Sequence, residues 1–62
     1  MVNVPVDLIF RGYGIRARQE GDRAFVADIF DRRGNFRCST MGGFLSRHSA
    51  IEEAKTIISA FR

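Results

Sequence analysis

Two side chains that often serve in catalysis, Cys38 and His48, occur once each in this sequence. A thiol and an imidazole can pair as nucleophile and base, but no carboxylate is spaced to orient the histidine. Cys38 lies in an apolar stretch, where cysteine is usually a small core residue, and His48 is expected on a solvated first helical turn. Asp28 and Asp31 fall on opposite faces of one predicted strand, so they make no carboxylate pair for acid–base chemistry. We therefore predict that the protein is not an enzyme.

A metal site and a cofactor are not expected either. A structural zinc site takes about four Cys or His ligands, and this chain has one of each. The single cysteine also excludes an internal disulfide and fits a reducing, cytoplasmic setting.

Charge is the unusual part of the composition. Ten basic residues face seven acidic ones, nine of the ten are arginine, and the formal net charge is +3. An arginine-rich surface could bind phosphates, because guanidinium groups do so in bidentate fashion. Alternatively, a genome with GC-rich codons uses arginine wherever a solvated positive charge suffices. The candidate nucleic-acid contacts are Arg16, Arg18, Arg32, Arg33 and Arg37.

A smaller anion could bind where the last element of the chain begins. Ser46, Arg47 and His48 surround backbone N–H groups that have no partner within a helix. The alternative is ordinary capping, in which the Ser46 side chain takes the same N–H groups.

The last third of the chain, residues 42–62, has the pattern of an amphipathic helix. Its apolar residues recur at spacings of three, four and seven, which places them on one side of a 3.6-residue helix. Ser46 is the expected cap, with Ser49 as an alternative one turn later. Phe44 and Leu45 are expected to anchor the start of the helix. The apolar side of the helix comprises Ala50, Ile51, Ala54, Ile57, Ile58 and Phe61.

Upstream of this helix, residues 13–19 and 24–31 alternate in polarity as half-buried strands do. A turn at residues 20–22, where Gly21 can take a positive φ, predicts an antiparallel hairpin. The expected cross-strand pairs are Phe25 with Ala17, Ala27 with Ile15, and Ile29 with Tyr13. Residues 7–10 could form a short edge strand or a segment that packs across the end of the helix.

A third strand is expected at residues 36–41. Residues 31–35 predict a type I turn followed by Gly34 in the left-handed region, which is a common hairpin connection. We place Phe36, Cys38 and Thr40 on the core side of this strand, because the opposite facing would bury Arg37.

These elements predict one α+β domain over residues 1–62, in which a three-stranded antiparallel meander is covered on one face by the C-terminal helix (β-β-β-α). Residues 1–5 are expected to be frayed. The start of the chain lacks a signal-peptide pattern, and no apolar run approaches the roughly 18 residues of a membrane span. We therefore expect a cytoplasmic protein that makes no membrane contact.

The face of the sheet away from the helix is the predicted interaction face. A 62-residue domain buries only about 60% of its unfolded surface, so self-association would add burial that neither a disulfide nor a metal supplies. We predict a homodimer through this face or through an edge strand, with Arg16 or Arg18 pairing with Asp28 across a two-fold axis. Weak nucleic-acid binding by the arginines is the alternative function. The predicted face comprises Arg16, Arg18, Val26, Asp28 and Phe30.

Residues 23–62 resemble the YegP-like family of small β-β-β-α repeats. The resemblance rests on Asp31 and Gly34 in a strand turn, on a corner at residues 39–46 that ends in a serine cap, and on Ala50 and Ala54 in the helix. Members of that family often carry two tandem copies that complete one another. The resemblance therefore implies that self-association replaces the missing copy, and it implies no activity.

The segment from Gly43 to Arg47, with Ala54 and Lys55 further on, is also similar to the end of a double-stranded-RNA-binding domain. There a glycine-rich corner and a lysine-rich helix start contact phosphates. This chain lacks that domain's N-terminal helix and offers only Arg47 and His48 at the helix start.

Overall fold

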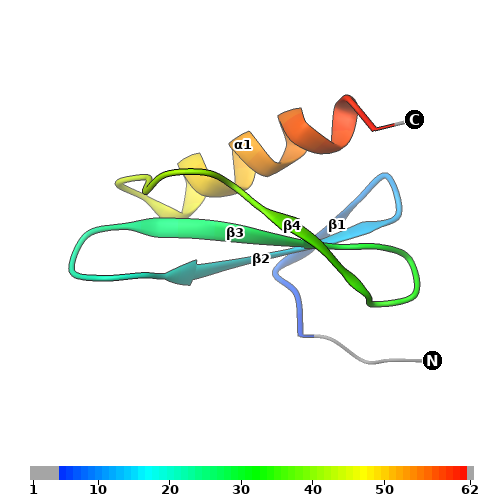
Figure 1. Ribbon diagram of the computed structural model, residues 1–62, viewed down its shortest axis with the longest axis horizontal. Helices are drawn as coiled ribbons and strands as arrows, with labels where there is room; N and C mark the ends of the chain where they lie inside the picture. Colours follow the sequence, from blue (N-terminus) through cyan, green and yellow to red (C-terminus); the bar gives the residue numbers. More distant parts are fainter. Residues whose placement is uncertain (1–4, 62) are drawn as a thin grey trace.

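The computed structural model describes residues 5–61, which form a four-stranded sheet and one helix. The sheet is antiparallel throughout in the order β1-β2-β3-β4, and α1 lies across one of its faces (Figure 1). The α+β class is confirmed, but the predicted three strands are wrong because residues 8–10 add a fourth. Except for Pro5, the predicted frayed segment lies outside the described residues. The elements are β1 (Leu8–Phe10), β2 (Tyr13–Gln19), β3 (Phe25–Phe30), β4 (Phe36–Ser39) and α1 (Arg47–Ser59).

The first strand owes its place to a two-residue turn that joins it to β2. Arg11 and Gly12 have φ angles of 53° and 86°, as a type I′ hairpin turn requires, and Phe10 pairs with Tyr13 on either side. Asparagine or glycine usually occupies the first of these positions, because most side chains are strained at positive φ. With an arginine at this position, the sequence lacks the usual signal of a type I′ turn.

The hairpin of β2 and β3 forms as predicted, but its register differs by two residues. Phe25 pairs with Gln19, Ala27 with Ala17, and Ile29 with Ile15. The predicted pairs are wrong because the connection spans five residues and is closed by a 2.7 Å hydrogen bond from the Glu20 N–H to the Ala24 carbonyl. A shift of two residues leaves every side chain on its predicted face, since side chains alternate along a strand.

The turn from β3 to β4 is the predicted one. The Gly34 N–H donates to the Asp31 carbonyl at 3.0 Å, and Gly34 has a φ of 85°. The ladder then shifts, so that Cys38 pairs with Ile29 while Phe36 pairs with Phe30.

This shift places one extra residue, Arg37, in β4. Cys38 contacts the core and Thr40 is buried, as predicted. The core position predicted for Phe36 is wrong, because the extra residue turns its side chain to the opposite face of the sheet.

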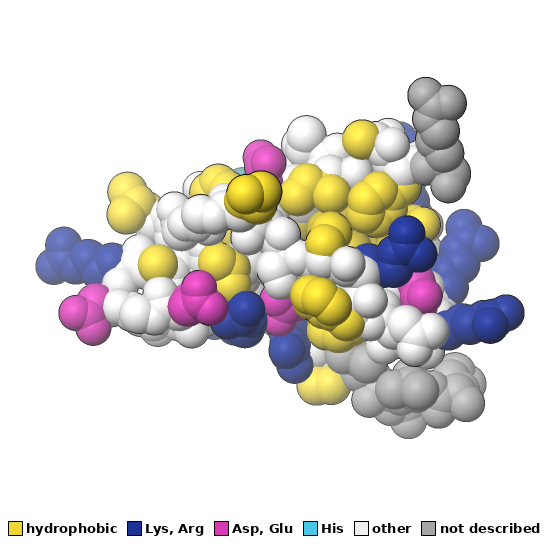
Figure 2. All heavy atoms as spheres, viewed as in Figure 1, with side chains coloured by type: hydrophobic (Ala, Val, Ile, Leu, Met, Phe, Trp, Pro, Cys, Tyr) yellow, Lys and Arg dark blue, Asp and Glu magenta, His cyan; other side chains and the backbone are white. Residues whose placement is uncertain are grey.

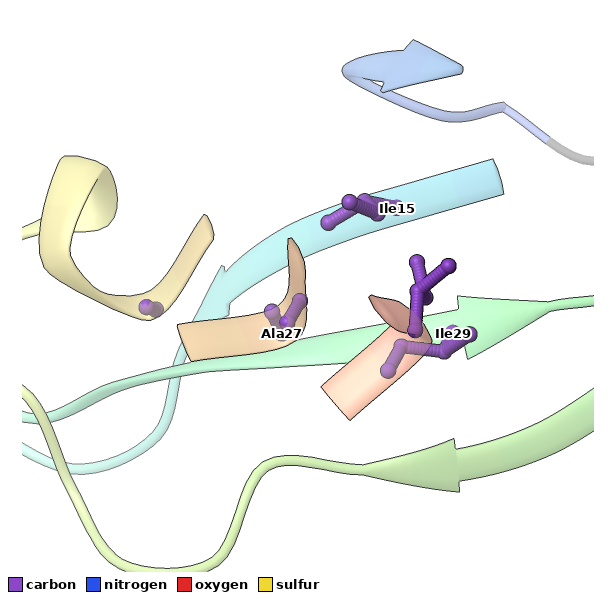
Figure 3. Packing of buried hydrophobic residues seen from close by; sticks show 6 residues of the cluster. Ile15, Ala27 and Ile29 are labelled. Carbon is purple, nitrogen blue, oxygen red and sulfur yellow. The ribbon is translucent and has the colours of Figure 1, made fainter. Parts of the chain in front are cut away.

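The core lies between α1 and the adjacent face of the sheet (Figure 3). Ile15 and Ile29 are completely buried there, and the small side chains of Ala50 and Ala54 let the helix approach the sheet closely. The whole predicted apolar side of the helix belongs to this core, whose fully buried members are Ile15, Ala27, Ile29, Ala50, Ala54 and Ile58.

The helix begins at Arg47, and Ser46 caps it by accepting the Ser49 N–H at 3.1 Å. This confirms Ser46 over the alternative cap. Phe44 packs against the core and bridges to Phe25, whereas the anchoring role expected for Leu45 is wrong because its side chain is 85% exposed.

Replacing Arg11 by asparagine should stabilise the fold. Relief of the positive-φ strain favours the variant by about 1 kcal/mol. Loss of the stacking of the Arg11 guanidinium 5.5 Å from the Phe10 ring centroid offsets about half of that. We expect a net gain of about 0.5 kcal/mol and a thermal midpoint higher by about 2–4 °C.

Thermal unfolding followed by circular dichroism measures this gain. Arg23→Asn is the matched control, because it removes the same charge from an exposed turn residue that has no positive φ. A variant of Arg11 no more stable than this control would contradict the strain argument.

Candidate functional site

The candidate site is the face of the sheet opposite α1, called here the helix-free face. Residues that pair directly across neighbouring strands share a face, so the pairing of Gly14 with Phe30 and of Arg16 with Asp28 defines it. Pairing through β1 and β4 adds further members to the predicted set. The face comprises Ile9, Gly14, Arg16, Arg18, Val26, Asp28, Phe30, Phe36 and Ser39.

Asp28 is the centre of a hydrogen-bonded network on this face. The residue is 3% exposed, and its carboxylate accepts hydrogen bonds from the Ser39 hydroxyl at 2.6 Å, from Arg18 Nε at 2.9 Å and from Arg16 Nη2 at 3.1 Å. Arg18 Nη1 also donates to Glu20 at 2.9 Å. Both arginines that were predicted to pair with Asp28 of a second copy are therefore already paired with it within one chain.

The network keeps Asp28 ionised although it is buried. Burial by itself raises the pKa of this carboxyl, but hydrogen bonds from Ser39, Arg18 and Arg16 outweigh it and hold the pKa below its ordinary value. The hydrogen bonds to Asp28 and Glu20 in turn raise the pKa of Arg18. The middle of the helix-free face therefore carries two positive and two negative charges that compensate one another.

The apolar residues of β3 on this face are covered by their neighbours. Val26 is 5% exposed, and Phe30 is 9% exposed beneath the Arg16 guanidinium and the edge of the Phe36 ring, whose centres lie 5.5 and 5.9 Å from the Phe30 ring centroid. The predicted interaction face is therefore not open at β3, because long side chains from β2 and β4 cover this strand.

Exposed apolar surface lies instead on the two edge strands. Ile9 of β1 is 66% exposed and Phe36 of β4 is 59% exposed. Neither belongs to the predicted face. Residues 7–10 are predicted either as an edge strand, which the structure confirms, or as a segment across the end of the helix, and Phe36 is predicted in the core. Met41 and Leu45 are also exposed, but they lie in the connection between β4 and α1.

A small hollow of about 110 Å³ lies at one end of this face. Ile9, Phe30 and Arg32 are among its lining residues. Val6 packs over Gly14 so closely that a Cβ at Gly14 would lie 2.8 Å from Val6 Cγ1. The chain before β1 therefore crosses the helix-free face and covers part of it.

Two of the three residues of the predicted anion site at the start of α1 make hydrogen bonds within the chain. The Ser46 hydroxyl caps the helix, and Arg47 Nη1 donates to the Ala17 carbonyl at 2.9 Å. Asp7 lies 3.6 Å from Arg47 and accepts the Ala17 N–H at 2.7 Å. His48, the third predicted member, is exposed on the first turn.

The five predicted nucleic-acid contacts fall into three groups. Arg16 and Arg18 belong to the Asp28 network, and Arg32 and Arg33 lie in the turn between β3 and β4. Arg37 does not share the face of Arg16, because its guanidinium lies 5.7 Å from the ring centroid of Phe61, beyond the end of α1.

Side chains that could bind a metal ion do not cluster within residues 5–61. In this part of the chain no group of three or more His, Cys, Asp or Glu side chains could hold a metal ion. Cys38 is partly buried against the core, and His48 is the second residue of α1. Among the described residues there is also no helix with the length and apolarity to cross a bilayer.

Comparisons with protein-family models, with curated proteins and with solved structures found no match to this chain. The resemblance to the YegP-like family stays a prediction. The fold and the site define a small α+β domain with one face of its sheet packed by a helix and the other covered at its central strand β3 by its own side chains.

Replacing Asp28 by asparagine should destabilise the domain and change its response to acid. The variant loses the charge that pairs two arginines, and because those arginines remain partly exposed to water we expect a loss of about 2 kcal/mol. The pKa of Asp28 is lowered on folding, so its contribution is present above the ordinary Asp pKa of about 3.9 and disappears as the pH falls through the lower folded value.

Urea unfolding between pH 7 and pH 2 measures both effects. The parent should lose stability below about pH 4, and Asp28→Asn should lose less over the same interval. Asp22→Asn, on an exposed turn, is the control and should follow the parent. An acid limb of equal slope in the parent and in Asp28→Asn would contradict the role of Asp28.

Proposed function

We propose that the protein is a non-enzymatic interaction module that forms a homodimer through its helix-free face. The observation that carries this proposal is the exposure of Ile9 and Phe36, two large apolar side chains on the only sheet face that no helix covers. Apolar surface in this position is typical of a contact with another molecule. A domain of 62 residues also gains stability from such a contact.

The size of the face predicts a weak dimer. Figure 1 looks down the 15 Å axis of the molecule and sees the sheet nearly edge-on, with the 33 Å axis horizontal. The helix-free face therefore covers roughly 500 Å², which is less than the about 800 Å² that each partner buries in a standard interface. Interfaces at this low end of the size range belong mostly to weak and transient complexes.

The interface would be apolar rather than ionic. Asp28 accepts hydrogen bonds from Arg16 and Arg18 of its own chain. The charges of these three groups are therefore already paired within one chain and are not expected to form ion pairs with a second copy. Contacts through Ile9 and Phe36 would respond little to salt, because ionic screening weakens charge pairs and not apolar burial.

Nucleic-acid binding, the alternative predicted from the sequence, is favoured by a separate observation. That observation is the exposure of arginines outside the Asp28 network, on the turns between β1 and β2 and between β3 and β4.

Replacing Phe36 by serine should weaken the dimer without unfolding the domain. Burying a phenylalanine side chain contributes about 1.5–3 kcal/mol, so the variant should raise the dissociation constant at least about tenfold. Phe30→Asp is a poorer choice, because Phe30 is buried and the variant would damage the fold itself.

Light scattering on a size-exclusion column, over a concentration series at low and high salt, measures the association. The parent's mass should rise from 7.0 kDa towards twice that value, independently of salt. Leu45→Ser is the control, because it removes a large apolar side chain that is even more exposed than Phe36 (85% against 59%) from outside the helix-free face. A parent that stays monomeric at the highest concentration, or an equal effect of the control, would refute the proposed dimer.

A further inference from the structure

The meander brings two hairpin turns to the same end of the molecule (Figure 1). The turn between β1 and β2 carries Arg11, and the turn between β3 and β4 carries Arg32 and Arg33. The turns touch, because the Arg32 side chain packs against Gly12 and leaves no room there for a Cβ. Arg37 follows from the first half of β4. We call the surface formed by Arg11, Arg32, Arg33 and Arg37 the arginine end.

The arginine end carries a charge that nearby side chains do not neutralise. Within residues 5–61, carboxylate oxygens lie within 4.0 Å of Arg16, Arg18, Arg47 and Lys55, but of none of the four arginines at this end. All four are exposed. Figure 2 shows dark blue Lys and Arg side chains projecting at this end of the molecule, on the right of the view.

The one carboxylate in these two turns is engaged with the backbone. Asp31 Oδ1 accepts the Asn35 N–H at 2.8 Å and the Arg33 N–H at 2.9 Å. It shapes the turn on which Arg32 and Arg33 are carried, and it offsets only part of the charge of the four guanidinium groups.

Structural roles explain only part of this cluster. Arg37 stacks on Phe61 just beyond the C-terminus of α1, where a positive charge stabilises the helix. Arg11 occupies a position where its backbone is strained and asparagine or glycine would fit better. Arg32 and Arg33 make no side-chain hydrogen bond or ion pair within the described chain. The three turn arginines therefore have no ion-pair partner within residues 5–61, and they are available to bind a ligand that supplies negative charge.

The surface between the turns is also shaped to receive a ligand. Tyr13, Asp31, Arg32 and Arg33 line an open hollow, and the Tyr13 and Phe61 rings make an edge contact with 5.1 Å between ring centroids. An aromatic ring beside guanidinium groups is the combination with which proteins bind phosphates and stack bases of unpaired strands.

We propose that the arginine end binds the phosphodiester backbone of single-stranded nucleic acid. A flexible strand can bring successive phosphates to two short turns, whereas a duplex presents its phosphates at fixed positions and is usually entered by a helix or a β-ribbon. Here α1 presents its C-terminal end, where the helix dipole is negative. Ile9 and Phe36 take no part in this site, although Arg32 lines the same small hollow as Ile9 at the border of the helix-free face.

Fluorescence anisotropy with a labelled oligothymidylate of about 15 nucleotides tests the proposal. Four phosphate contacts on a single strand predict a salt slope of about −3, which weakens binding roughly 50-fold between 50 and 200 mM salt. Arg33→Gln should weaken binding about 3- to 10-fold and reduce the slope by about 0.7. Arg23→Gln removes the same charge from the opposite turn and should bind as the parent does.

A second variant separates binding from folding. Arg11→Asn should raise the thermal midpoint, as argued above, and yet weaken binding of the same oligonucleotide several-fold. Equal affinities of Arg33→Gln and Arg23→Gln would overturn the proposal. Tighter binding to a duplex of the same length, or to phosphatidylserine vesicles, would overturn the choice of a single strand as partner.

Discussion

The pairing of Asp28 with Arg16 and Arg18 decides how the sheet is sealed on the side that α1 does not cover. A sheet with one helix has one packed layer, so Val26 and Phe30 on the central strand β3 would otherwise face water. The carboxylate holds the two arginines in place, the Arg16 guanidinium lies over the Phe30 ring, and Arg18 lies directly across from Val26. The charged network thereby covers apolar side chains that a second layer of helix or sheet would otherwise cover.

This arrangement separates the charges of the molecule into two populations. Arginines in the middle of the helix-free face are bound to Asp28 and Glu20, and they contribute rigidity rather than an external field. Arginines on the turns between β1 and β2 and between β3 and β4 have no such partners within residues 5–61, so the field of this domain is concentrated at one end. The exposed apolar side chains of the sheet lie apart from these charges, on the edge strands β1 and β4.

Local sequence patterns predicted the helix and the central hairpin well. The helix followed from its 3.6-residue period, and Ser46 followed from the chemistry of capping. The hairpin of β2 and β3 was found with each side chain on its true face, because alternation survives a shift of two residues. What failed depended on single backbone details: an arginine in a type I′ turn concealed β1, and one extra residue in β4 reversed Phe36.

The candidate site was predictable in its location but not in its partners. Alternation placed Arg16, Arg18 and Asp28 together on the helix-free face, and the structure brings them into contact. Sequence alone does not say whether such a pair forms within one chain or between two. It also cannot show that a guanidinium and a neighbouring ring will cover Phe30, because that depends on side-chain conformations across three strands.

The contacts of Ala17 have a consequence for the state of the protein before folding is complete. Because β1 begins only at Leu8, β2 has no strand neighbour on its β1 side beyond Ile15. Asp7 and Arg47 bind the N–H and the carbonyl of Ala17 on that side instead. Arg47, one of these two residues, belongs to the first turn of α1. A chain whose helix has not yet docked therefore presents an open strand edge, which is the template on which chains aggregate. Docking of α1 both completes the core and closes that edge.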